Sequence, residues 1–209
     1  MRMVALDSWR GISALFVVLY HFGSAGPLGS HPLVRGSFLF VDYFFALSGF
    51  VIYDAYSERI RSFRALTDFL LRRIARIAPL HFVMLFAFIA MECAKLVMSR
   101  HYGTMLHHQP FTGTRSLASL PHQFALLQGM GTLPHLTWNA PSWSISAEFW
   151  TYVVFGLITT LCFRKMFVLA IVIACCSAGI LVTYSNEFID TSFHLGFFRC
   201  LYGFFVGII

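Results

Sequence analysis

The sequence predicts an all-α integral membrane protein with about six transmembrane helices, and two observations carry this prediction. Of the 209 residues, 58% are hydrophobic and only 11% are charged, whereas about 25% of the residues of a soluble domain are charged. Several apolar runs also approach the roughly 20 residues that cross a bilayer as a helix. The chain therefore has too few polar side chains to cover a water-soluble globule, and its low charge excludes intrinsic disorder.

Six apolar runs are candidate spans. The first is short, and it spans a membrane only if Arg10 and His21, which flank it, also enter the bilayer. The sixth remains apolar up to the last residue, which indicates a truncated protein. In order, the runs are Gly11–Phe22, Phe38–Tyr56, Pro79–Met98, Ala147–Phe163, Met166–Tyr184 and a run from about His194 to Ile209.

The connection over residues 99–146 is long for a loop, and loops of this length usually carry function or elements of their own. Within it, Phe124–Met130 is the candidate for a short re-entrant or interfacial helix. The histidines of this connection lack a carboxylate or cysteine that would complete a metal site, so no metal is expected.

Basic residues orient the predicted spans. The chain has a formal net charge of +6, and cytoplasmic loops of membrane proteins collect Lys and Arg. Six arginines lie between the second and third spans, Arg164 and Lys165 follow the fourth, and Arg2 and Arg10 lie near the N-terminus. We therefore expect a multi-pass protein of the inner (plasma) membrane with a cytoplasmic N-terminus, in which the basic residues set topology and bind no nucleic acid.

Ionisable residues inside spans are costly, and they are functional candidates by default. Arg10 and His21 are eleven residues apart, which puts them within about 20° of the same helix face and about 16 Å apart along the axis. One face then presents a guanidinium near the cytoplasm and an imidazole deeper in the bilayer. The alternative is that Arg10 marks topology and His21 is a hydrogen-bonded core histidine.

Two acids occupy the outer ends of predicted spans. Asp42 lies at the outer edge of the second span, and Glu148 lies within the first turns of the fourth, where a helix N-terminus tolerates a carboxylate. Glu148 is alternatively a partner for His21 or for an incoming hydroxyl group. Ser48 and Gly49 are interpreted as small residues that let helices approach, because the first glycine of a nucleophile elbow is missing before Ser48.

Three arginines, Arg72, Arg73 and Arg76, lie on an amphipathic helix end before the third span, and the first and last of them share a face. Such a cluster binds either anionic lipid headgroups or a phosphate or diphosphate ligand through forked hydrogen bonds. The spacing alone favours the first interpretation, in which the cluster binds lipid headgroups and sets topology.

Four motifs occur together in one order. They are Asp-x-x-Arg-Gly at Asp7–Gly11 with His21 after it, Asp-x-Phe-Phe-x-Leu-Ser-Gly-Phe at Asp42–Phe50, Arg-Arg-x-x-Arg-Ile-x-Pro at Arg72–Pro79, and Trp-Ser-Ile-Ser-x-Glu at Trp143–Glu148. This order resembles the acyltransferase 3 family of bacterial membrane acyltransferases, which includes O-antigen and exopolysaccharide O-acetylases. The resemblance implies that residues 1–209 form the membrane domain of that family, incomplete at the C-terminus, as the N-terminal part of a bundle of ten or so helices.

The resemblance implies transfer of an acyl group, usually acetyl, from acyl-CoA to a hydroxyl of a carbohydrate or glycolipid, with acetyl-CoA as a substrate and no bound cofactor. It implies catalytic roles for His21, Arg10 and Glu148. His21 would take the hydroxyl proton or carry the acyl group transiently. Donor phosphates would contact Arg72, Arg73 and Arg76, and Asp42 would engage the acceptor, with membrane lipid around the bundle. The alternatives are a secondary transporter, which should show a repeated half, a non-catalytic membrane protein and an inactive fragment.

Overall fold

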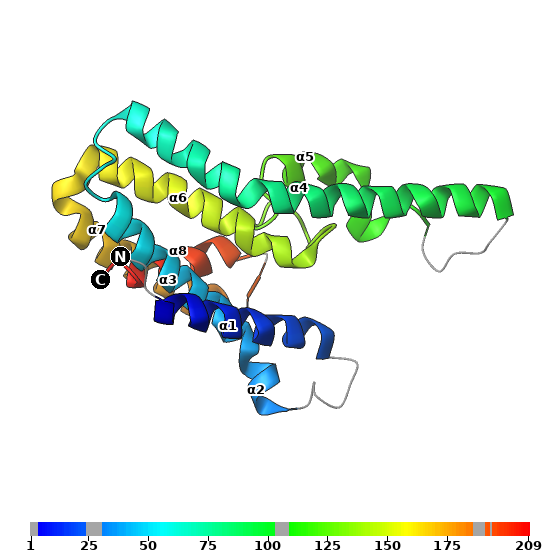
Figure 1. Ribbon diagram of the computed structural model, residues 1–209, viewed down its shortest axis with the longest axis horizontal. Helices are drawn as coiled ribbons and strands as arrows, with labels where there is room; N and C mark the ends of the chain where they lie inside the picture. Colours follow the sequence, from blue (N-terminus) through cyan, green and yellow to red (C-terminus); the bar gives the residue numbers. More distant parts are fainter. Residues whose placement is uncertain (1–3, 24–30, 103–108, 186–190, 193) are drawn as a thin grey trace.

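A computed structural model describes residues 4–23, 31–102, 109–185, 191–192 and 194–209, and this part of the chain is built from helices and turns without strands (Figure 1). The prediction of an all-α protein is confirmed. The α-helices are α1 (Val4–Gly23), α2 (Pro32–Arg35), α3 (Leu39–Tyr56), α4 (Phe63–Tyr102), α5 (Leu120–Phe124), α6 (Trp143–Cys162), α7 (Met166–Tyr184) and α8 (Gly196–Val206).

Three helical stretches of the described residues are long and apolar enough to cross a membrane: Pro32–Tyr56, Phe63–His101 and Ala140–Tyr184. The predicted count of six spans is therefore not confirmed. α1 has 20 residues, but it is not among these three stretches. α8 has 11 residues, which rise about 16 Å, roughly half the thickness of a bilayer core.

The stretch Ala140–Tyr184 contains two helices. A short 3₁₀ turn at Phe163–Lys165 separates α6 from α7, and Figure 1 shows α7 turning back after it. These helices begin and end close to the two runs that the sequence predicts there.

α4 differs from the sequence prediction. It is one helix of 40 residues, about 60 Å long, and it joins the arginine segment to the predicted third span. Pro79 lies inside it and not at a helix start. A proline removes one backbone donor, and membrane helices tolerate this where neighbouring groups satisfy the freed carbonyl.

The predicted short helix at Phe124–Met130 is wrong in its position. The structure has α5 at Leu120–Phe124 and turns up to Met130. Pro121 stands in the first turn of α5, where a proline favours a helix start. Leu126 has a φ of 52°, which a right-handed helix cannot include.

The short helix α8 lies at the centre of the bundle and packs against α3, α6 and α7. Its contact with α3 depends on glycine. A Cβ at Gly49 would collide with the backbone of Phe204, and a Cβ at Gly207 would collide with the backbone of Ala46. Small residues allow such close approach between membrane helices, as the sequence predicts for Gly49.

An aromatic core joins α4 to α6 and α8. The ring of Phe69 lies 6.0 Å from the rings of Tyr152 and Phe155, and the ring of Phe155 lies 5.7 Å from that of Phe204. The α3–α4 and α6–α7 connections lie at the same end of the molecule as the start of α1 and the end of α8 (Figure 1). The α4 helix packs against α6, and its arginine segment lies near the functional site.

Candidate functional site

Two cavities contain most of the predicted site residues. Of the two ionisable residues on the shared face of α1, Arg10 lines one cavity and His21 lines the other. We name them the arginine cavity and the histidine cavity. The arginine cavity, of about 290 Å³, is lined by Arg10, Ser48, Val51, Ile52, Arg76, Ile77, Leu80, Ile145, Glu148 and Tyr152. The histidine cavity, of about 130 Å³, is lined by Val17, Tyr20, His21, Phe38, Val41, Leu136, Ala140, Pro141, Trp143, Ser192 and Arg199.

A hydrogen-bonded cluster of a carboxylate and two hydroxyls forms part of the arginine cavity. Oε1 of Glu148 accepts hydrogen bonds from the Tyr152 hydroxyl at 2.6 Å and from the Ser48 hydroxyl at 2.7 Å. The two hydroxyl oxygens lie 2.8 Å apart. Tyr152 follows Glu148 by one helical turn on α6, and Ser48 comes from α3. Sequence reasoning took Ser48 as a packing residue, although its place in the Asp42–Phe50 motif was a signal.

Two guanidinium groups line the same cavity. Within the described residues, neither Arg10 nor Arg76 has an ion pair or hydrogen bond, and Oε2 of Glu148 also has none. Cations without partners are costly inside a membrane protein. A cavity with two such guanidiniums is therefore suited to an anionic ligand, which each of them can hold with forked hydrogen bonds.

The predicted arginine cluster separates in the structure. Both Arg72 and Arg76 have exposed side chains, but only Arg76 lines the arginine cavity. Arg73 turns to the aromatic core, where its guanidinium donates a 3.1 Å hydrogen bond to the Tyr56 hydroxyl and lies 5.7 Å from the ring of Phe69. Only one of the three arginines therefore reaches the cavity.

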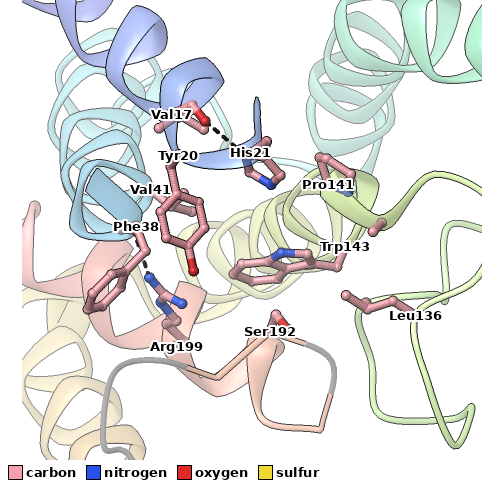
Figure 2. A pocket seen from close by; sticks show the side chains of 11 residues that line it. Val17, Tyr20, His21, Phe38, Val41, Leu136, Pro141, Trp143, Ser192 and Arg199 are labelled. Carbon is pink, nitrogen blue, oxygen red and sulfur yellow. Dashed lines mark hydrogen bonds between the residues drawn. The ribbon is translucent and has the colours of Figure 1, made fainter. Parts of the chain in front are cut away.

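The histidine cavity is shown in Figure 2, where the His21, Tyr20 and Trp143 rings surround a common space. Nδ1 of His21 lies 2.8 Å from the carbonyl oxygen of Val17. Because a carbonyl oxygen only accepts, Nδ1 carries the hydrogen, and in the neutral ring Nε2 has the lone pair. His21 is thus oriented by its own helix, and its neutral ring presents the lone pair of Nε2, which a general base needs.

An ion pair lies beside this cavity. Arg199 donates to both carboxylate oxygens of Asp42, at 2.8 and 2.7 Å, and to the carbonyl oxygens of Phe38 and Thr191, each at 3.0 Å. The side chain of Arg199 is only 2% exposed. Asp42, predicted to bind substrate, therefore joins α3 to α8. An arginine in an apolar run needs an acidic partner, which was the signal for this pair.

The structure brings Glu148 together with Arg10 and Arg76, and not with His21. No hydrogen bond joins Glu148 to His21 among the described residues. The predicted role of Glu148 in orienting the imidazole therefore has no geometric support, and its oxygens face the cavity of the guanidiniums.

Comparisons with known proteins place the chain in a family. The family profile described as "Acyltransferase domain" (acyltransferase 3) matches residues 3–209. A Rhizobium radiobacter protein described as "Protein 2 in picA locus" is 41% identical over 81 residues, which are 38% of this chain and 40% of that protein. The match thus spans less than half the length of this curated relative, and no solved structure matches. Because the profile covers nearly the whole chain, this protein belongs to the acyltransferase 3 family of membrane acyltransferases.

Proposed function

We propose that the protein transfers an acyl group, typically acetyl, from acyl-CoA to a hydroxyl of a carbohydrate or glycolipid acceptor. The observation that carries this proposal is that Arg10 and His21, both on α1, line two different cavities. One cavity offers unpaired guanidiniums for an anionic donor, and the other offers an oriented imidazole as a base. Family membership supports the acyl chemistry and does not favour secondary transport.

The arginine cavity suits the donor. CoA carries phosphates, and the guanidiniums of Arg10 and Arg76 match phosphate oxygens in charge and geometry. The apolar side chains of Ile52, Ile77 and Leu80 offer contacts to the uncharged part of the donor. The offset of about 16 Å between Arg10 and His21 along α1 suits a donor whose long pantetheine arm extends from the phosphates to the imidazole.

The histidine cavity suits the acceptor hydroxyl. Its volume is about 130 Å³, so a single hydroxyl-bearing group fits and a whole oligosaccharide does not. Aromatic walls with a few polar groups are the usual composition of a small-molecule site. The rest of the acceptor would lie outside this cavity.

His21 supplies the proton transfer in this proposal. The acceptor oxygen forms a bond to the acyl carbon, and its proton moves to Nε2 of His21. The carbon–sulfur bond of the thioester then breaks, and the imidazolium returns the proton to the leaving CoA thiolate. The hydrogen bond from Nδ1 to the Val17 carbonyl persists throughout, so the ring needs no reorientation between the two transfers.

The membrane setting belongs to the same proposal. The basic segments predicted to be cytoplasmic lie at one end of the bundle, where Arg61 stacks at 3.3 Å on the ring of Phe163. This arrangement supports an inner-membrane protein with a cytoplasmic N-terminus, in which the donor enters from the cytoplasm. Anionic lipid headgroups would then contact the exposed Arg72.

The test is acyl turnover by the protein in membrane vesicles supplied with radiolabelled acetyl-CoA and a lipid-linked glycan. His21→Ala should lower CoA release and label transfer by about 10²–10⁴-fold, which is the usual contribution of one general acid–base group. His135→Ala, an exposed histidine outside both cavities, is the matched control and should leave turnover unchanged. Wild-type turnover by His21→Ala would refute the role of the imidazole, and an inactive wild-type protein would refute the proposed reaction.

A further inference from the structure

The hydroxyl–carboxylate cluster of the arginine cavity has a role beyond packing. We propose that Ser48 and Tyr152 are positioning residues, which hold the Glu148 carboxylate so that Oε2 accepts a hydrogen bond from the bound ligand. The ligand group would be an amide N–H or a hydroxyl of the molecule that Arg10 and Arg76 bind. This inference rests on the proposed function.

The hydrogen bonds divide the two carboxylate oxygens. Both hydroxyl oxygens lie against Oε1 of Glu148, at 2.6 and 2.7 Å, and 2.8 Å from each other, so their two protons serve three contacts, of which at least one is a hydrogen bond to Oε1. Both hydroxyls therefore engage Oε1, and neither engages Oε2. Oε2 keeps its acceptor capacity, because no described residue donates to it, and Glu148 lines the cavity.

The helices that supply the two hydroxyls are held independently of the cluster. Tyr152 is buried and four residues after Glu148 on α6, so both side chains share one helix face. Ser48 precedes Gly49, whose missing Cβ lets α3 lie directly on the backbone of Phe204 in α8. Since α6 also packs on α8, this contact sets how far the short Ser48 side chain reaches towards α6.

Such support matters for a group that acts on a ligand. A carboxylate held through one oxygen by neighbouring hydroxyls has less freedom to rotate about its terminal bond, so it needs less reorganisation when the ligand binds or reacts. Removing one hydroxyl restores that freedom. The loss should then appear only while the Glu148 carboxylate is present, because the hydroxyls act through it.

A double-mutant cycle tests this dependence. kcat/KM for acetyl-CoA is measured in Ser48→Ala, Tyr152→Phe and Glu148→Gln, and in each hydroxyl variant combined with Glu148→Gln. Each hydroxyl variant should lower kcat/KM about 10-fold alone, as for one lost hydrogen bond to a carboxylate, and less than about 2-fold in the Glu148→Gln background. Effects that multiply fully in the double variants would overturn the proposal.

Two controls separate positioning from folding. Ser48→Thr keeps the hydroxyl and should retain kcat/KM near the wild-type value, whereas a loss as large as that of Ser48→Ala would count against a hydrogen-bonding role. Thr160→Ala removes another hydroxyl of α6, which donates only to the carbonyl of Gly156 in its own helix, and it should have no effect. If Ser48→Ala does not fold, the double-mutant cycle is measured with Tyr152→Phe and Glu148→Gln alone.

A second readout needs no turnover. The infrared carboxylate band that disappears in Glu148→Gln should shift in both Ser48→Ala and Tyr152→Phe, because each removes a hydrogen bond from Oε1. An unshifted band in both variants would overturn the positioning role. If the wild-type protein shows no acyl turnover while the band shifts, the proposed reaction fails and the positioning of Glu148 stands.

Discussion

Two arginines on one helix, four residues apart, provide a direct test of the arginine cavity. Sequence spacing puts Arg72 and Arg76 on a common face of α4 and predicts similar effects when either is replaced. In the structure both side chains are exposed, but Arg76 lines the arginine cavity and Arg72 does not. We therefore expect Arg76→Gln to weaken donor binding strongly, and Arg72→Gln to leave it nearly unchanged.

The magnitudes follow from the surroundings of each side chain. Arg76 has no partner among the described residues, so its replacement breaks no internal ion pair and removes only contacts with the ligand. A hydrogen bond to a charged group contributes about 1.5–3 kcal/mol, so the Kd for acetyl-CoA should rise about 10- to 150-fold. A surface substitution usually changes free energy by less than about 0.5 kcal/mol, which limits the effect of Arg72→Gln to about 2-fold.

The assay is equilibrium binding of acetyl-CoA to the purified protein in lipid nanodiscs, with dephospho-CoA as a second ligand. Both variants remove one positive charge from the same helix, so a general electrostatic effect would change the two Kd values equally. Equal weakening by the two variants would refute the assignment of Arg76 to the donor site and would restore the common-face interpretation. Unchanged binding in Arg76→Gln would refute it as well.

Two further outcomes are expected. Asp42→Asn leaves the buried Arg199 without its counter-charge, and breaking a buried pair costs about 3–5 kcal/mol, so the midpoint of thermal unfolding should fall by about 10 °C. The control is Asp54→Asn, which replaces an exposed acid on the same helix and should not shift the midpoint. Equal midpoints for the two variants would show that the pair does not support the fold. Reporter fusions after Arg64 should report the cytoplasm and fusions near Thr114 the outside, and the opposite result at either site would reverse the proposed entry side of the donor.

Much of the fold could be predicted from local sequence. The limits of α3, α6 and α7 fall within a few residues of the predicted spans, because a run of apolar residues makes a membrane helix almost regardless of its neighbours. The course of α4 could not be predicted in this way. Whether a helix continues through Pro79 depends on what surrounds the freed carbonyl, which the local sequence does not contain.

The residues of the candidate site were only partly predictable. His21 and Arg10 stand out because ionisable residues are rare in apolar helices, and the order of motifs indicated the family that the comparisons then showed. The partners of these residues did not stand out. Ser48 was interpreted as a small packing residue. Asp42 was predicted to bind the acceptor, whereas the structure pairs it with Arg199.

By itself, then, the sequence determined the class of the protein, the helices with strong apolar runs and the residue types available for chemistry. Only the tertiary structure decided which of them meet: Arg76 rather than Arg72 in the arginine cavity, Ser48 against Glu148, and Arg10 and His21 in two different cavities. The physical reason is that helical periodicity sets the direction of a side chain relative to its own axis, whereas the rotation and axial offset between helices depend on contacts between residues far apart in the chain. In this protein those contacts include the close approach of α3 to α8 at Gly49.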